Sequence, residues 1–77
     1  MILPNKVLKF EDSIMGKLTY ILDVLKKEDM LIGDLYQELS DEFDDVNSFM
    51  LALDVLFVLN AVVLDKGSGV LKYVNRT

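Results

Sequence analysis

The spacing of hydrophobic positions predicts two amphipathic helices in the first part of the chain. The first helix is expected to run from about Asp12 or Ser13, either of which can cap it, to about Lys27. The second helix is expected to cover residues 32–43. Because side chains three and four positions apart share one face of a helix, each helix has a hydrophobic stripe that we expect to form core. The stripes consist of Ile14, Leu18, Ile21, Leu22 and Leu25 in the first helix and of Ile32, Leu35, Tyr36, Leu39 and Phe43 in the second.

The third predicted helix is hydrophobic almost all the way round. The carboxylates of Asp44 and Asp45 can accept the free amide protons of its first turn, and Asn60 is a natural stop. One broad side can fill a small core and consists of Phe49, Ala52, Leu53, Leu56, Phe57 and Leu59. The opposite side consists of Asn47, Met50, Leu51, Asp54, Val55 and Val58.

This opposite side of the third helix is the candidate binding surface. A domain of 77 residues has too little mass to bury a helix on both sides, so we expect another protein chain, or a second copy of this one, to cover it. In the alternative interpretation, residues 2–10 cover this side and Met50 is ordinary core. Asp54 is the only charge in the apolar run, and it either faces solvent or binds a lysine or arginine of the partner.

Extended segments complete the predicted fold. Residues 6–10 predict a short strand or an extended arm. Residues 61–64 and 70–74 predict a hairpin whose loop, residues 65–69, contains glycine. A short N-terminal strand, three helices and a C-terminal hairpin are the element order of a winged helix-turn-helix with the hairpin as its wing. We therefore predict an α+β, mainly α fold in which residues 1–77 form a single winged-helix domain. The alternative is an unrelated three-helix domain with a hairpin.

The amino-acid composition argues against a catalytic or metal-binding function. There is no histidine and no cysteine, so the serine and threonine hydroxyls have no imidazole to activate them. The acidic run at residues 41–45 lacks the alternate carboxylates, central glycine and closing glutamate of an EF-hand loop, and we interpret it as a solvated corner between helices. We expect no enzyme activity, no cofactor and no metal. The lack of cysteine and of any apolar run of membrane length favours the cytoplasm.

The distribution of charge argues against a DNA-reading function. The formal net charge is −5, and no lysine or arginine lies between Glu28 and Asp65, the span that contains the second and third helices. A helix-turn-helix that binds DNA needs basic residues to neutralise phosphates, so we do not expect sequence-specific recognition. Lys66 and Lys72 in the hairpin and Arg76 after it leave weak, nonspecific contact with nucleic acid open. We therefore expect a protein-binding domain.

A family resemblance points in the same direction. The stretch FMLALDVLFVLNAV at residues 49–62, with LYQEL at residues 35–39, resembles the small middle components of bacterial ABC-three-component systems. LPNK at residues 3–6 and SIMGK at residues 13–17 are similar to theirs too, so the likeness covers nearly the whole chain. The resemblance implies a compact winged-helix adaptor that links an SMC-like or ABC-type ATPase to a third, effector component in conflict and antiphage systems. It implies no catalytic residues.

Overall fold

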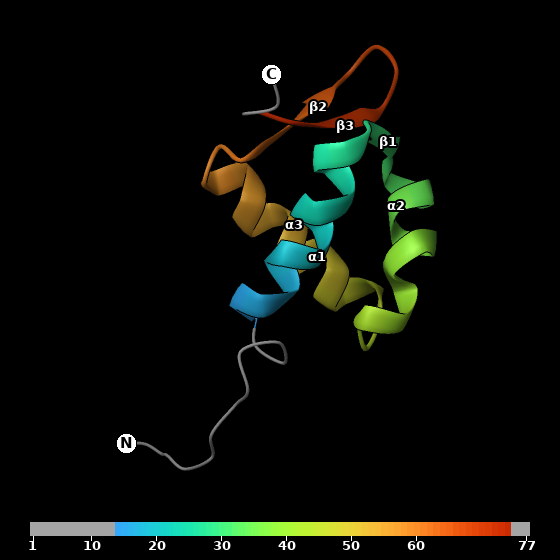
Figure 1. The fold of residues 1–77 in the computed structure, drawn as a ribbon, viewed down its shortest axis with the longest axis vertical. Coiled ribbons are helices and arrows are strands. Elements are labelled where there is room, and N and C mark those ends of the chain that lie inside the picture. The colour runs from blue at the N-terminus through green and yellow to red at the C-terminus, as the bar shows by residue number, and fades with distance from the viewer. Residues whose placement is uncertain (1–13, 75–77) are drawn as a thin grey trace.

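The structure, a computed structural model, describes residues 14–74, and these form three α-helices, a 3₁₀ turn and three strands (Figure 1). In chain order the elements are α1 (Ile14–Lys27), β1 (Met30–Leu31), α2 (Ile32–Leu39), the 3₁₀ turn η2 (Ser40–Glu42), α3 (Val46–Val58), β2 (Val62–Asp65) and β3 (Val70–Tyr73). The fold is α+β and mainly helical, in a winged-helix-like layout, as predicted. The strand predicted at residues 6–10 and the caps Asp12 and Ser13 lie outside the described residues.

The second helix is shorter than its hydrophobic pattern predicts. α2 ends at Leu39, η2 follows, and Phe43 is extended, with φ −125° and ψ 143°. The backbone N–H of Phe43 donates to the Ser40 carbonyl over 3.3 Å and closes the turn. This change of direction carries the Phe43 side chain into the core. The pattern therefore predicted the burial of Phe43 correctly and its secondary structure wrongly, because serine and aspartate favour turns over helix interiors.

Lys17 connects α1 to this turn. Its ammonium group donates a hydrogen bond to the Glu42 carbonyl. The same group lies 5.7 Å from the ring centre of Phe43 and 5.9 Å from that of Tyr20. A cation at this distance over an aromatic face contributes about 0.5–1 kcal/mol at an exposed site, so Lys17 helps to hold η2 against α1.

The sheet is antiparallel, with strand order β1-β3-β2, and it lies at one end of the molecule beyond the helices (Figure 1). β3 is the middle strand: Leu71 pairs with Met30 on one side and with Leu64 on the other. The hairpin of β2 and β3 was predicted, whereas β1 was not. A strand of two residues is too short to show an alternating pattern, and only its pairing with β3 defines it.

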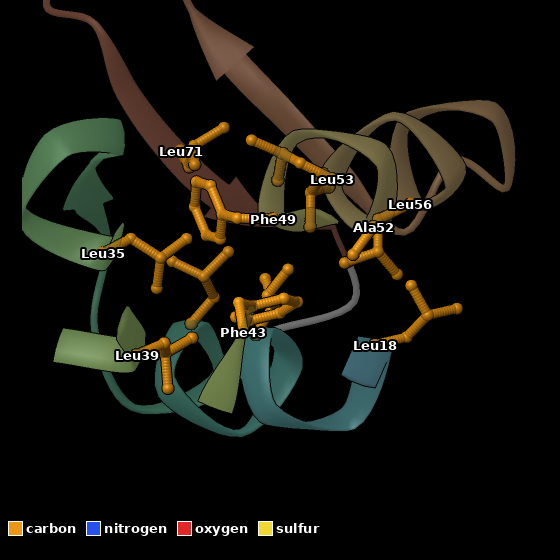
Figure 2. Packing of buried hydrophobic residues seen from close by; sticks show 12 residues of the cluster. Leu18, Leu35, Leu39, Phe43, Phe49, Ala52, Leu53, Leu56 and Leu71 are labelled. Atoms are coloured by element: carbon orange, nitrogen blue, oxygen red, sulfur yellow. The ribbon is translucent and has the colours of Figure 1, made fainter. Parts of the chain in front are cut away.

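The core is built around one side of α3. Phe49 is fully buried, and its ring centre lies 5.0 Å from that of Tyr36 and 5.5 Å from that of Phe43. Figure 2 shows this ring near the middle of the cluster. Aromatic pairs at such distances and tilted angles contribute about 0.5–1.5 kcal/mol beyond the area they bury. The buried hydrophobic residues are Leu18, Ile21 and Leu25 of α1, Leu35 and Leu39 of α2, Phe43 after η2, Phe49, Ala52, Leu53 and Leu56 of α3, Val62 of β2 and Leu71 of β3.

The two ends of α3 are capped by different hydrogen-bonding arrangements. At its start, the carboxylate of Asp45 accepts a hydrogen bond from the Ser48 backbone N–H over 2.9 Å. At its end, Asn60 takes the left-handed conformation with φ 61°. The N–H groups of Asn60 and Ala61 then donate back to the carbonyls of Phe57 and Leu56 over 3.0 and 2.9 Å, a Schellman arrangement. Of the two carboxylates proposed to start the helix, only Asp45 is the N-cap.

One predicted core residue is wrongly placed by the helical pattern. Leu59 was assigned to the core side of the third helix, but 59% of its surface is exposed. The helix ends at Val58, and Leu59 is the C-cap. The turn that follows reverses the chain, so the angular projection that holds inside the helix fails at this residue. Phe57, assigned to the same side, is half-buried and packs against the core.

The adjacent aspartates at the start of α3 give a matched test of capping. Replacing the N-cap in Asp45→Ala removes an acceptor from the first turn, and we expect the free energy of unfolding to fall by about 0.5–2 kcal/mol. The control Asp44→Ala removes the same charge from an exposed neighbour and should change it by less than about 0.5 kcal/mol. Urea unfolding followed by circular dichroism measures both. Equal losses in the two variants would show that charge near the helix start, and not the cap hydrogen bond, carries the effect.

Candidate protein-binding surface

The buried side of α3 determines which residues of this helix face outward. Phe49, Ala52, Leu53 and Leu56 point into the core. On the opposite side, Met50 is 40% exposed, Leu51 57% and Val58 83%, and Asn47 and Asp54 are exposed as well. We call these five residues, Asn47, Met50, Leu51, Asp54 and Val58, the α3 outer face.

Val55 is the exception among the six residues that the sequence assigned to this surface. It is half-buried and packs against the core cluster. It lies at the margin of the outward side of the helix, four residues after Leu51 and next to the side that is buried. Val55 therefore belongs to the border of the core, and replacing it would disturb folding as well as any contact.

Asp54 lies among hydrophobic neighbours. Met50 precedes it by four residues, Leu51 by three, and Val58 follows it by four, and these are the spacings of adjacent side chains on a helix surface. It is the only charged residue in α3. The α3 outer face is thus an apolar strip with a single carboxylate in its middle.

A cavity of about 210 Å³ opens next to one end of this strip. It lies between the start of α1 and the start of α3, and Leu51 belongs both to its lining and to the α3 outer face. The other lining residues are Ile14, Lys17, Phe43, Asp44 and Ser48. This mixture of apolar and polar groups is suited to a side chain of a bound partner. The sequence pattern did not predict the cavity, because its walls come from separate elements.

The charged side chains of α2 and α3 are all acidic. A wide, shallow depression between β1 and α2 is lined by Met30, Asp34, Gln37 and Glu38. No lysine or arginine occurs in α2, η2 or α3. In a winged-helix protein that binds DNA, the helix equivalent to α3 enters the major groove. In this chain, that helix would bring a carboxylate toward the phosphates of the DNA backbone. The charge of these elements therefore opposes DNA binding.

The basic residues of the hairpin are partly neutralised. Lys72 and Lys66 are exposed, but the ammonium group of Lys72 lies 3.9 Å from the carboxylate of Asp65. Hydrogen bonds from the Gly67 backbone N–H and then from the Ser68 side chain lower the pKa of Asp65, so this carboxylate stays ionised beside Lys72. Arg76, the third candidate for nucleic-acid contact, lies outside the described residues.

The described residues form neither a metal-binding cluster nor a membrane-spanning helix. Between residues 14 and 74, no three carboxylates gather closely enough to hold a metal ion. No helix in the same span is long and apolar enough to cross a membrane. The hydroxyl of Thr19 donates to the Gly16 carbonyl over 2.7 Å within α1, which is a structural role.

Comparison with known proteins gives one family. A family model described as ABC-three component system Middle Component 7 matches residues 3–71. No curated protein and no solved structure matches the chain significantly. The match covers α1, α2, α3, β1, β2 and the beginning of β3, and so includes the whole α3 outer face.

The charge distribution predicts that any contact with duplex DNA is weak and strongly dependent on salt. In a titration at low and moderate salt, we expect binding only at low salt, because each neutralised phosphate weakens affinity by roughly one log unit per log unit of salt. Lys66→Ala combined with Lys72→Ala should remove the remaining binding, while Lys27→Ala, at the end of α1, serves as the control. Tight binding at physiological salt that the double variant loses would contradict this expectation.

Proposed function

Because the chain belongs to the ABC-three component system Middle Component 7 family, we propose that it is a non-catalytic adaptor subunit that binds the other protein components of such a system. The partners are an ABC or SMC-like ATPase and an effector protein, and the setting is bacterial antiphage defence in the cytoplasm. In this proposal the chain acts as one winged-helix domain, and the α3 outer face is its contact with a partner.

The exposed apolar strip on α3 is the observation that supports this proposal most strongly. Leu51 and Val58 are more than half exposed on a helix whose other side is fully buried. Burying one such side chain against a partner contributes about 1.5–3 kcal/mol, so the strip favours protein association. The cavity beside Leu51 offers a place for a partner side chain to insert.

Asp54 determines the kind of partner surface that fits this strip. When the strip is covered, its carboxylate loses water, and an unpaired buried charge is costly. A lysine or arginine on the partner, placed between apolar side chains, would compensate this loss. We therefore propose a partner surface that is mainly apolar and carries one central cation.

The first test removes the apolar anchors. We expect Leu51→Asp combined with Val58→Asp to weaken binding to the ATPase or effector component by at least about tenfold, because each anchor contributes about 1 kcal/mol or more. Both side chains are exposed, so circular dichroism and the unfolding midpoint should stay close to those of the unsubstituted chain. Val55 is left unchanged because it packs against the core.

The control for this test is Leu31→Asp. Leu31 is 45% exposed on β1, away from the α3 outer face, and its replacement adds the same charge. Calorimetric titration of each purified variant with the component encoded beside it measures the affinities. A folded double variant that binds as well as the unsubstituted chain would contradict the proposed contact. So would an unfolded double variant, since it would place these side chains in the core.

The second test isolates the charge of Asp54. Asp54→Asn keeps the shape of the side chain, and we expect the stability of the free protein to change by less than about 0.5 kcal/mol. The affinity for the partner should fall, and its dependence on salt should become weaker because one charge pair across the contact is lost. Equal affinity of both proteins at every salt concentration would show that Asp54 is a solvated surface residue.

A further inference from the structure

Among the described residues, β2 lies at one edge of the three-stranded sheet. In the part of the chain that the structure describes, β2 pairs with β3 alone. The Val74 N–H donates to the Ala61 carbonyl over 2.9 Å, so Ala61 and Val74 form a hydrogen-bonded pair just before β2. Hydrogen-bonded and non-hydrogen-bonded pairs alternate along an antiparallel ladder. The backbone N–H and C=O groups of Val62 and Leu64 therefore point away from β3, toward the free edge.

The side chains of β2 do not protect this edge. The strand reads Val-Val-Leu-Asp, with no proline and no lysine. Val63 is 45% and Leu64 37% exposed. Edge strands of soluble proteins usually carry lysine, proline or a bulge that prevents pairing with another strand. Here the hairpin lies at the end of the molecule, beyond the helices, with an apolar strand at its border (Figure 1).

We propose that β2 pairs antiparallel with β2 of a second copy of this chain, with Val63 opposite the partner's Val63. This pairing joins two three-stranded sheets into one continuous sheet across a twofold axis. The interaction does not depend on the proposed adaptor function, because it uses the backbone of the hairpin and not the α3 outer face.

The register follows from the direction of the backbone groups. Val62 and Leu64 both point their N–H and C=O groups outward, so Val62 must lie opposite the partner's Leu64 for each to exchange both bonds. The twofold axis then passes between Val63 and the partner's Val63. A shift by two residues would place Val62 opposite the partner's Lys66, which lies in the turn after β2 and is not extended.

The same register is free of charge conflict, which is why a second copy fits this edge. Asp65, the only charged residue of β2, falls opposite the partner's Ala61, so no like charges face each other along the paired strands. On the outer face of the sheet, Val63 meets the partner's Val63. A β-branched pair in direct opposition is among the combinations that stabilise antiparallel strands.

Cysteine cross-linking tests both the surface and the register. The chain has no native cysteine, so a single introduced thiol can pair only with that of another copy. In the proposed dimer Val63 forms a non-hydrogen-bonded pair with about 4.5 Å between Cα atoms, which is within disulfide range. We expect Val63→Cys to form a disulfide-linked dimer rapidly under mild oxidation. Leu31→Cys is the matched control, since Leu31 is equally exposed, at 45%, but lies on the opposite edge strand.

Sedimentation equilibrium tests the association without a covalent link. The unsubstituted chain should show a concentration-dependent monomer–dimer equilibrium. Val63→Lys places two like charges in direct opposition and should raise the dissociation constant by at least about tenfold, whereas Leu31→Lys should leave it unchanged. Circular dichroism of Val63→Lys checks the fold, and the cross-linking result decides the matter if this variant unfolds.

Three outcomes would overturn the proposed pairing. One is an unsubstituted chain that stays monomeric at the highest concentration at which it remains dissolved. Another is equal cross-linking of Val63→Cys and Leu31→Cys. The third is a dimer that survives Val63→Lys but is lost in the variant with Leu51→Asp and Val58→Asp, which would place self-association on the α3 outer face. The partner titrations of the adaptor proposal are separate measurements, so either proposal can fail alone.

Discussion

The burial of one side of α3 around Phe49 is the interaction on which the rest of this structure depends. The Phe49 ring contacts Tyr36 of α2 and Phe43 after η2, and the same side of α3 packs against the buried leucines of α1. These contacts fix the rotation of α3 about its own axis. Because the helix is apolar on both sides, fixing the buried side also determines which hydrophobic residues remain in solvent. The α3 outer face is thus a direct consequence of core packing.

Within residues 14–74, no further layer covers the other side of α3, where Leu51 and Val58 are exposed. The described part of the chain has one hydrophobic cluster, and α1, α2 and the sheet cover α3 from one direction. Covering its other side would require another layer of structure. The charge pattern then restricts what can supply that layer. α2 and α3 contain acidic residues and no basic ones, so they repel phosphate groups.

The two interaction surfaces proposed for this chain differ in the groups that they present. The α3 outer face presents side chains, and its proposed specificity comes from the shape of the strip and from the single carboxylate of Asp54. The free edge of β2 offers backbone groups, which every sequence has, so its specificity comes from register and from the absence of charge conflict. Since the two surfaces lie on different elements, a dimer formed through β2 leaves both α3 outer faces free. Two faces in one assembly would strengthen binding to a partner that is itself a dimer.

The sequence by itself predicted the features that depend on neighbours along the chain. Helical periodicity identified α1 and α3, the glycine-containing loop identified the hairpin, and the helix positions of Met50, Leu51, Asp54 and Val58 identified the outward side of α3. Only the tertiary structure decided the rest. β1 exists because β3 pairs with it, and the extended Phe43 after η2 is held by its burial in the core. Val55 is half-buried because it packs against the core, and Leu59 is exposed because the chain reverses at Asn60. Each of these outcomes depends either on contacts between residues far apart in the chain or on a single backbone angle. The local spacing of hydrophobic residues determines neither the distant contacts nor the backbone angle.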